Sequence, residues 1–310
     1  MAAFKLLDLS KIPVPDVINS PDFEQKYSEL KDILLGINDK YADVLALESE
    51  PLAVALQAFA YRELILEAKI NDATRANMLA SAQGNDLDAI GARYNVGRLV
   101  LQDENLLSNP PVPHIAEEDD RYRRRIQMAF DGLNTAGSTD AYIFHALSAS
   151  AEVLDADATS PSPCEMVVTI LSREGNGGAG AELVRVVRNY FGLTDDGSKT
   201  LGSSKVRPLG DKLTVSSAHI LEYSVVAELS ILPGPSARVV LADAKNALSQ
   251  YTKDTHRLGY DVTLSGLYAA LHRPGVHNVK LISPTANLTV DYHQAAYCVG
   301  INIKIGGVDE

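Results

Sequence analysis

Apolar residues recur every three or four positions over roughly the first hundred residues, a spacing typical of amphipathic helices. The first such face follows Asp22 and comprises Phe23, Tyr27, Leu30, Ile33, Leu34 and Ile37. Asp22 has the short acceptor side chain that helix N-caps prefer. We therefore predict a helical region over residues 22–98.

A much longer helix is predicted from Pro51, because proline at the first helical position has no N–H that would need a partner. The chain from Leu52 to Ala82 contains no glycine or proline and keeps apolar residues at helical spacing, and Gly84 ends the pattern. At a rise of about 1.5 Å per residue this helix would be about 45 Å long. Such a length is typical of helices that pack in a bundle or against another subunit.

Residues 117–150 separate this helical region from a mixed one. The acidic residues Glu117–Asp120 suit the first turn of a helix, whose N-terminus has a partial positive charge. An apolar face then follows at Ile126, Ala129, Phe130 and Leu133. After a break at residues 134–137, Ser138 or Thr139 is predicted to cap a second helix.

Beyond Ser150, alternating and β-branched runs predict strands. The strongest strands are expected at 166–171, 223–232, 276–282 and 297–305, with helices at 182–191, 237–251 and 265–271. A helix near Ser138 leads to a strand at Val153, and a helix at Ser265 leads to a strand at Val276. This repeated order of helix and strand predicts an internal duplication. The predicted fold class is α+β, with an N-terminal helical region that contains a long helix, followed by two related small α+β units.

Five segments follow from these patterns. Residues 1–21 contain Pro13, Pro15 and Pro21 and are predicted to form an extended arm. The others are the helical region 22–98, a Pro-containing linker 99–116, a first α+β unit with its leading helix 117–218, and a second α+β unit 219–310.

Charge and composition exclude several classes of protein. The net charge is −12 and the isoelectric point about 5.0, which argues against a protein that neutralises nucleic-acid phosphates. The sequence contains two cysteines, Cys164 and Cys298. We therefore expect no disulfide framework, and we expect a reducing, cytoplasmic setting. The N-terminus lacks the features of a signal peptide, and the apolar runs are too short for membrane spans.

One motif suggests an enzyme. Residues 175–180 satisfy the pattern G-x-G-x-x-G, and they lie between a predicted strand and a predicted helix, as in dinucleotide-binding sites. However, a polar triplet at 172–174 separates the strand from the glycines, and Asp195 and Asp196 fall in a Gly/Ser loop. A flexible strand-to-helix connection is therefore the favoured interpretation, and a nucleotide-binding enzyme is the alternative.

Other candidate sites are weaker. Arg121, Arg124 and Arg125 share one side of the predicted helix and follow four acidic residues, so we expect salt bridges on a solvated or interface face. The seven histidines are spread singly, in patterns unlike those of metal sites. No nucleophile–base arrangement is recognisable. The sequence therefore predicts no catalytic residues, metal or cofactor.

An ordered series of short motifs resembles the baseplate J-like proteins of contractile-tailed phages. The N-terminal motifs are Tyr61-Arg62-Glu63, Asn71-Asp72-Ala73, Leu79–Gly84, Leu87-Asp88 and Gly97-Arg98. The later motifs are Glu118–Arg123 with Ile126, Ala136–Ser138, Ala141-Tyr142, Ala146–Ser148, Val206–Leu209, Leu258-Gly259, Asp261-Val262 and Gly275-Val276. The series spans nearly the whole chain, with a departure at Cys164-Glu165, where the family often has Pro-Gly.

This resemblance implies a structural subunit of the tail baseplate wedge and no enzymatic activity. The partners it implies are a second wedge subunit, a sheath-initiator-like subunit, further copies of the chain and the tail hub, without nucleic acid or membrane. It implies assembly in the host cytoplasm and a place in the mature virion tail. Tyr61, Arg62 and Glu63 join Arg121, Arg124 and Arg125 as candidate interface residues.

Overall fold

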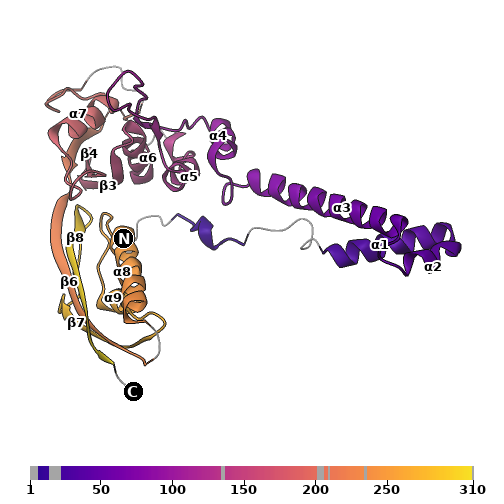
Figure 1. Cartoon of the computed structure of the whole chain (residues 1–310). Helices are drawn as coiled ribbons and strands as arrows, with labels where there is room; N and C mark the ends of the chain where they lie inside the picture. Colours follow the sequence, from indigo (N-terminus) through magenta and orange to yellow (C-terminus); the bar gives the residue numbers. More distant parts are fainter. Residues whose placement is uncertain are drawn as a thin grey trace. The chain divides into compact units, whose positions relative to one another are not determined.

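The computed structural model describes residues 6–13, 22–133, 137–200, 206–208, 210–233 and 236–308. The chain divides into two compact units (Figure 1). Unit 1 comprises residues 1–98 and 118–127, and unit 2 comprises residues 99–117 and 128–310. Within these ranges the fold is mixed α+β with a helical N-terminal region, which confirms the predicted fold class.

Unit 1 is helical, and two of its helices run side by side, α1 (Phe23–Ile37) and α3 (Pro51–Ala76) (Figure 1). A short 3-10 helix, η2 (Asp39–Tyr41), and α2 (Ala42–Leu45) connect them. The Asp22 carboxylate accepts a hydrogen bond of 2.9 Å from the Glu24 N–H, so the predicted N-cap is confirmed. Pro51 begins α3, as the sequence predicted.

The long helix α3 ends at Ala76, so the predicted end at Ala82 is wrong. The Asn77 side chain donates to the Ala73 carbonyl oxygen at 2.9 Å and so competes with continuation of the helix. The carbonyl groups of Leu79 and Ala82 instead accept hydrogen bonds from Arg123. Their partner is remote in sequence, which is why helical spacing alone misplaced the end.

Two further helices complete unit 1, α4 (Gly84–Arg93) and α5 (Asp119–Gln127). Tyr122 of α5 is 1% exposed and donates a hydrogen bond of 2.7 Å to the Val96 carbonyl oxygen after α4. Gly91 of α4 lets the tyrosine approach, since a Cβ there would lie 2.6 Å from the Tyr122 Cζ. Helix α5 therefore belongs with the helical region, whereas the sequence grouped it with the segment 117–218.

The apolar face predicted beyond Ile126 is correct only in part. Ile126 and Ala129 are buried, but Phe130 and Leu133 are 68% and 75% exposed. Helix α5 ends at Gln127, and the 3-10 helix η3 (Asp131–Leu133) follows, so these two side chains do not continue its buried face.

Part of the predicted N-terminal arm contacts unit 1. The 3-10 helix η1 spans Leu9–Lys11, and the Gln127 side chain donates to the Leu7 carbonyl oxygen at 2.9 Å. Residues 1–5 and 14–21 of the arm lie outside the described residues.

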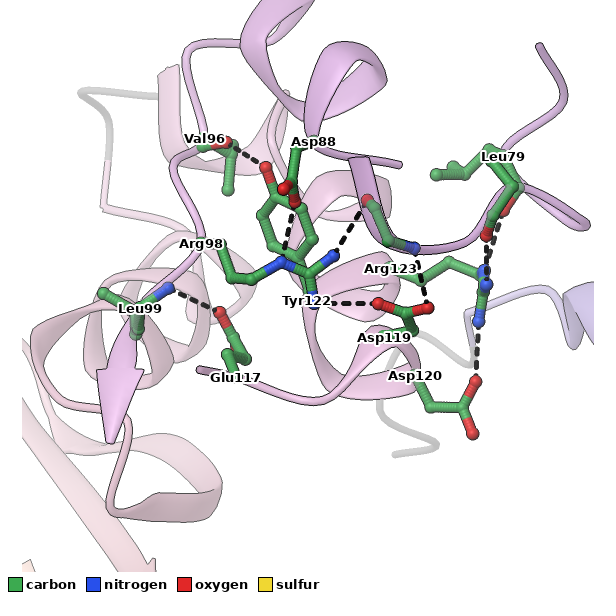
Figure 2. A network of polar contacts seen from close by, with 12 residues as sticks. Leu79, Asp88, Val96, Arg98, Leu99, Glu117, Asp119, Asp120, Tyr122 and Arg123 are labelled. Carbon is green, nitrogen blue, oxygen red and sulfur yellow. Dashed lines mark hydrogen bonds and ion pairs between the residues drawn. The ribbon is translucent and has the colours of Figure 1, made fainter. Parts of the chain in front are cut away.

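Residues 99–116, predicted to be a linker, form an ordered β-ribbon in unit 2. Strands β1 (Val100–Gln102) and β2 (Ile115–Ala116) pair antiparallel. Glu117 is 2% exposed, and its carboxylate accepts a hydrogen bond of 3.1 Å from the Leu99 N–H at the base of the ribbon (Figure 2). The prolines suggested an extended linker, but residues 99–116 form an antiparallel ribbon.

The first α+β part of unit 2 has a three-stranded sheet, in the order β3 (Val153–Ser162), β4 (Glu165–Ser172), β5 (Lys212–Ser217). Helices α6 (Thr139–Ala149) and α7 (Ala181–Tyr190) meet through Tyr142 and Phe191, whose rings are 5.7 Å apart. The Ser138 hydroxyl accepts from the Ala141 N–H at 3.2 Å, which confirms the cap that the sequence proposed.

The turn between β3 and β4 holds Cys164 at φ 63°, in the left-handed region. This conformation costs a residue with a Cβ about 1 kcal/mol, and glycine adopts it freely. We expect Cys164→Gly to raise the free energy of unfolding by up to about 1 kcal/mol. Urea unfolding of the reduced protein, with Cys164→Ser as the control for loss of the thiol, would measure this; equal stability of the glycine and serine variants would contradict it.

The second α+β part has the sheet β7 (Val276–Ser283), β6 (His219–Ile231), β8 (Gln294–Val308). Alternate residues of β6 are buried, as the period of two predicts. They pack under α8 (Ala237–Asp254) and α9 (Leu264–Leu271), which lie over one face of the sheet (Figure 1).

The two sheets share one arrangement, as the predicted duplication requires. Each has a central strand, β4 or β6, with an antiparallel neighbour on one side and a parallel neighbour on the other. Helices α6 and α9 each precede the antiparallel strand. The order along the chain differs, however. The central strand β4 is the second strand of the first sheet in sequence, whereas the central strand β6 is the first strand of the second sheet.

The two sheets meet through a small apolar cluster, whose buried members are Leu171, Ala218 and Ala295. Polar contacts add to it: the Leu258 N–H donates to the Asp155 carboxylate at 3.2 Å, and the Asn176 side chain donates to Glu222 at 3.3 Å. Asn176 belongs to the glycine motif and Leu171 precedes it by four residues, so this motif lies at the contact between the sheets.

Candidate functional site

The glycine motif that suggested an enzyme is a packed connection between β4 and α7. Three of its amide N–H groups have protein partners: Gly177 donates to the Glu174 carbonyl oxygen, Gly178 to the Asn176 side chain and Ala179 to the Ser217 hydroxyl. A phosphate site needs such N–H groups available to the ligand. The geometry therefore favours the connection over the dinucleotide site.

Gly177 itself faces protein side chains. Its φ is +96°, and a Cβ there would lie 2.7 Å from the His256 Nε2 and 2.7 Å from a Leu171 methyl carbon. The glycine thus allows close packing against Leu171 of β4 and the imidazole of His256, which lies in the loop between α8 and α9.

Other features of the described chain also fail to assemble catalytic chemistry. A cavity of about 600 Å³ is lined by Tyr251, Gly259, Tyr260, Asp261, Thr263, Ser265 and Gly266. Its carboxylate, Asp261, accepts a hydrogen bond of 2.7 Å from the Val290 N–H. Among the described residues, His, Cys, Asp and Glu do not form groups of three or more that could hold a metal ion. None of the helices in the described ranges combines the length and apolarity needed to cross a membrane.

The first three candidate interface residues lie on α3. Tyr61, Arg62 and Glu63 are all exposed, and Tyr61 is 58% exposed. Around them α3 displays large apolar side chains, with Phe59 at 61%, Leu66 at 51% and Ile70 at 48% exposure. Ala53 and Ala60 are fully buried in this same helix. Helix α3 therefore has apolar side chains both on its buried face and on its exposed surface.

The neighbouring helix α1 also exposes large apolar side chains. Ile33 and Ile37 of α1 are 62% and 77% exposed, although they share a helical face with the less exposed Leu30 and Leu34. Apolar side chains on both helices thus remain uncovered within unit 1, which is unusual for a surface helix that packs on one side only.

The three arginines on α5 do not form one exposed patch. Arg125 is 3% exposed, and its guanidinium donates to the Gly97 carbonyl oxygen at 3.2 Å. Arg121 and Arg124 are half-buried. Arg125 therefore supports unit 1 from inside, and a role in contacts with other proteins remains a prediction for Arg121 and Arg124.

A polar network in unit 1 centres on Arg98 (Figure 2). Its guanidinium is 2.7 Å from the Asp88 carboxylate and 2.8 Å from the Asp119 carboxylate, and it lies over the Tyr122 ring at 4.6 Å. Asp119 also accepts a hydrogen bond of 3.0 Å from the Gly84 N–H, at the start of α4. The acidic quartet thus supplies a charge to α4 as well as to the first turn of α5.

Arg123 forms a second anchor in this network. It donates to the carbonyl oxygens of Leu79 and Ala82 at 2.8 and 2.7 Å and pairs with Asp120 at 2.6 Å (Figure 2). The motifs quoted for the family resemblance contain Arg98 and Arg123, but the sequence pattern did not reveal their partners. Their shared task is to fix the chain between α3 and α4 against α5.

Asp119 makes the stability of this network dependent on pH. Burial alone would raise the pKa of its carboxyl, but the Gly84 N–H and Arg98 outweigh burial and hold the pKa below its ordinary 3.8. A group with a lowered pKa stabilises the fold above its unfolded pKa of about 4, and this contribution is lost as the pH falls through its folded pKa.

We therefore expect Asp119→Asn to be less stable than the wild type at pH 7, with a difference that shrinks below about pH 4. Thermal unfolding between pH 3 and 7 would measure this, with Glu118→Gln as a neighbouring control. A constant difference across the range would mean that the charge of Asp119 is not what stabilises α4.

Three protein-family models match this chain over different parts. The baseplate J-like N-terminal domain matches residues 48–105, the baseplate J-like central domain residues 134–217, and the baseplate J-like protein C-terminal domain residues 223–304. The last two matches fall on the two sheets, in agreement with a repeated unit.

A relative covers almost the whole chain. Baseplate protein J of Escherichia phage P2 is 43% identical over 310 residues, which are 98% of this chain and 99% of that protein. The similarity to a baseplate protein argues against an enzyme, as does the filled glycine motif. These matches confirm the resemblance: the chain belongs to the baseplate J-like protein family and is a structural protein of a phage tail baseplate.

Proposed function

We propose that this chain is a wedge subunit of a contractile-tail baseplate, which assembles through protein contacts into a ring around the tail hub. The observation that carries this proposal is the uncovered apolar surface of α1 and α3, with Ile37 77% and Phe59 61% exposed. A helix with apolar residues on several sides is typical of the interior of a bundle. Additional helices from other subunits would bury this surface.

The proposed partners are a second wedge subunit, a sheath-initiator-like subunit, further copies of this chain and the hub. The similarity to baseplate protein J of phage P2 supports contacts with other baseplate components. Assembly in the host cytoplasm and incorporation into the virion tail follow from this role. Tyr61, Arg62 and Glu63 are exposed on α3, and we propose that they take part in the bundle contact.

Co-expression with the neighbouring tail proteins tests this proposal. We expect a defined complex by size-exclusion chromatography with light scattering, whereas the chain alone is monomeric or weakly dimeric. Phe59→Glu with Leu66→Glu is expected to prevent the complex without changing the circular dichroism of the isolated chain. Leu66→Ala, which keeps a good helix former and adds no charge, is the matched control and should weaken the complex less.

A chain that binds none of the tail proteins would contradict the wedge assignment. A complex that survives Phe59→Glu with Leu66→Glu would leave the assignment intact and move the contact away from α3. Charge reversal at Arg121 and Arg124 tests the second proposed contact. We expect impaired assembly with a folded chain, and loss of folding would instead make both arginines internal supports of unit 1.

A further inference from the structure

Two adjacent leucines stand exposed at the tip of the β-ribbon. Leu106 is 68% exposed and Leu107 is 99% exposed. Pro110 and Pro111, on the returning side of the same tip, are also exposed. Scattered apolar residues on a surface are ordinary, but an apolar tip formed by neighbouring residues is typical of contact sites.

Hydrogen bonds close the turn at this tip. Asn105 and Val112 exchange two backbone hydrogen bonds of 2.9 Å, and the Asn105 side chain accepts a hydrogen bond of 3.1 Å from the Leu107 N–H. The Ser108 hydroxyl lies 2.8 Å from the Asn105 carbonyl oxygen and 2.9 Å from the Pro110 carbonyl oxygen. The leucines are therefore presented on a hydrogen-bonded turn, which lowers the entropy cost of binding them.

Charge indicates what the tip can bind. Asp103 and Glu104 are exposed and are the only Asp, Glu, Lys or Arg residues between Leu99 and Ala116. This negative charge disfavours an anionic lipid surface, and it disfavours contact of the tip with the same acidic tip of a second copy. It favours a partner with basic side chains next to an apolar pocket.

We propose that the ribbon tip, residues 103–111, docks on a different protein of the baseplate and inserts Leu106 and Leu107 into an apolar pocket with a basic rim. This inference rests on the proposed function, because it takes the partner from the same assembly. Full burial of a leucine side chain corresponds to roughly tenfold or more in affinity. The acidic pair would mainly raise the rate of association and make it dependent on salt.

The test uses assembled tail particles and a photo-crosslinking amino acid in place of Leu107. We expect a single crosslink to another tail protein, identified by mass spectrometry. Leu107→Glu should lower incorporation of the chain into particles at least tenfold, while its melting temperature is unchanged. Val239→Glu is the matched control, because Val239 is also an exposed apolar residue, at 66% exposure on α8. The Val239→Glu chain should be incorporated into particles normally.

Charge reversal of Asp103 and Glu104 to lysine should slow incorporation and reduce its salt dependence. Crosslinks only to a second copy, binding of the wild type but not Leu107→Glu to phosphatidylglycerol vesicles, or normal incorporation of Leu107→Glu would overturn the docking proposal. Absence of the wild-type chain from tail particles would instead overturn the proposed function, so the two failures are distinguishable.

Discussion

Replacing Gly91 with alanine is expected to lower the free energy of unfolding of unit 1 by about 2 kcal/mol. Alanine is a better helix former than glycine by about 1 kcal/mol, which alone would stabilise α4. However, the added Cβ would overlap the Tyr122 hydroxyl and lie 2.8 Å from the Val96 carbonyl oxygen. Overpacking costs about 1–3 kcal/mol and loss of the Tyr122–Val96 hydrogen bond about 1 kcal/mol, so the steric effect outweighs the propensity.

Urea unfolding followed by circular dichroism would measure this loss, and hydrogen exchange would locate it in α4 and α5. Gly36→Ala in α1 is the matched control, because a Cβ there has open space within 4 Å. It should stabilise the chain by a few tenths of a kcal/mol up to about 1 kcal/mol. Equal effects of the two substitutions would show that Tyr122 does not pack against Gly91.

The parts of the fold that the sequence predicted are those set by local chemistry. Asp22 and Ser138 cap their helices because each side chain binds an N–H two or three residues later. The alternation along β6 reflects burial of one face of its sheet. In each case the residues that decide the structure are neighbours in sequence, so a pattern reveals them.

The incorrect predictions concern segments whose structure depends on a residue distant in sequence. Helix α3 does not continue through residues 77–82, where Arg123, distant in sequence, binds the carbonyl groups of Leu79 and Ala82. Arg125 was expected on a solvated or interface face, yet Gly97 accepts its hydrogen bond in the interior. The prolines of residues 99–116 predicted a linker, whereas the Asn105–Val112 pair closes a ribbon. Spacing carries no information about such partners.

The candidate functional residues also differ in how far the sequence could predict their surroundings. The sequence predicted a long helix with apolar residues at helical spacing, but it did not predict which of them would be exposed, as Phe59 is, and which buried, as Ala60 is. The significance of the glycine motif was not predictable, because His256, which fills the space beside Gly177, comes from the loop between α8 and α9. His256 is fixed there by the Ala296 carbonyl oxygen, 2.7 Å from its Nδ1, and by the edge of the Tyr297 ring.

This arrangement predicts that Gly177→Ala lowers the free energy of unfolding of unit 2 by about 3 kcal/mol. The left-handed φ of +96° costs an alanine about 1–2 kcal/mol, and overlap with His256 and Leu171 adds about 1–3 kcal/mol. Gly175→Ala is the control, since Gly175 also has a positive φ but open space around it. It should cost only about 1 kcal/mol. Thermal and urea unfolding of both variants would measure the difference.

A double-substitution cycle separates the packed connection from a phosphate site. If Gly177 serves to admit the imidazole, His256→Ala should relieve part of the Gly177→Ala defect, with a coupling of about 1 kcal/mol or more. If the motif binds a nucleotide, NAD, NADP or ATP at millimolar concentration should raise the melting temperature of the wild type. Gly177→Val cannot decide this alone, because it destabilises unit 2 with or without ligand. Strong coupling without any ligand effect therefore assigns the glycine to the joint between the two sheets, and additive effects together with a nucleotide shift would assign it to a binding site.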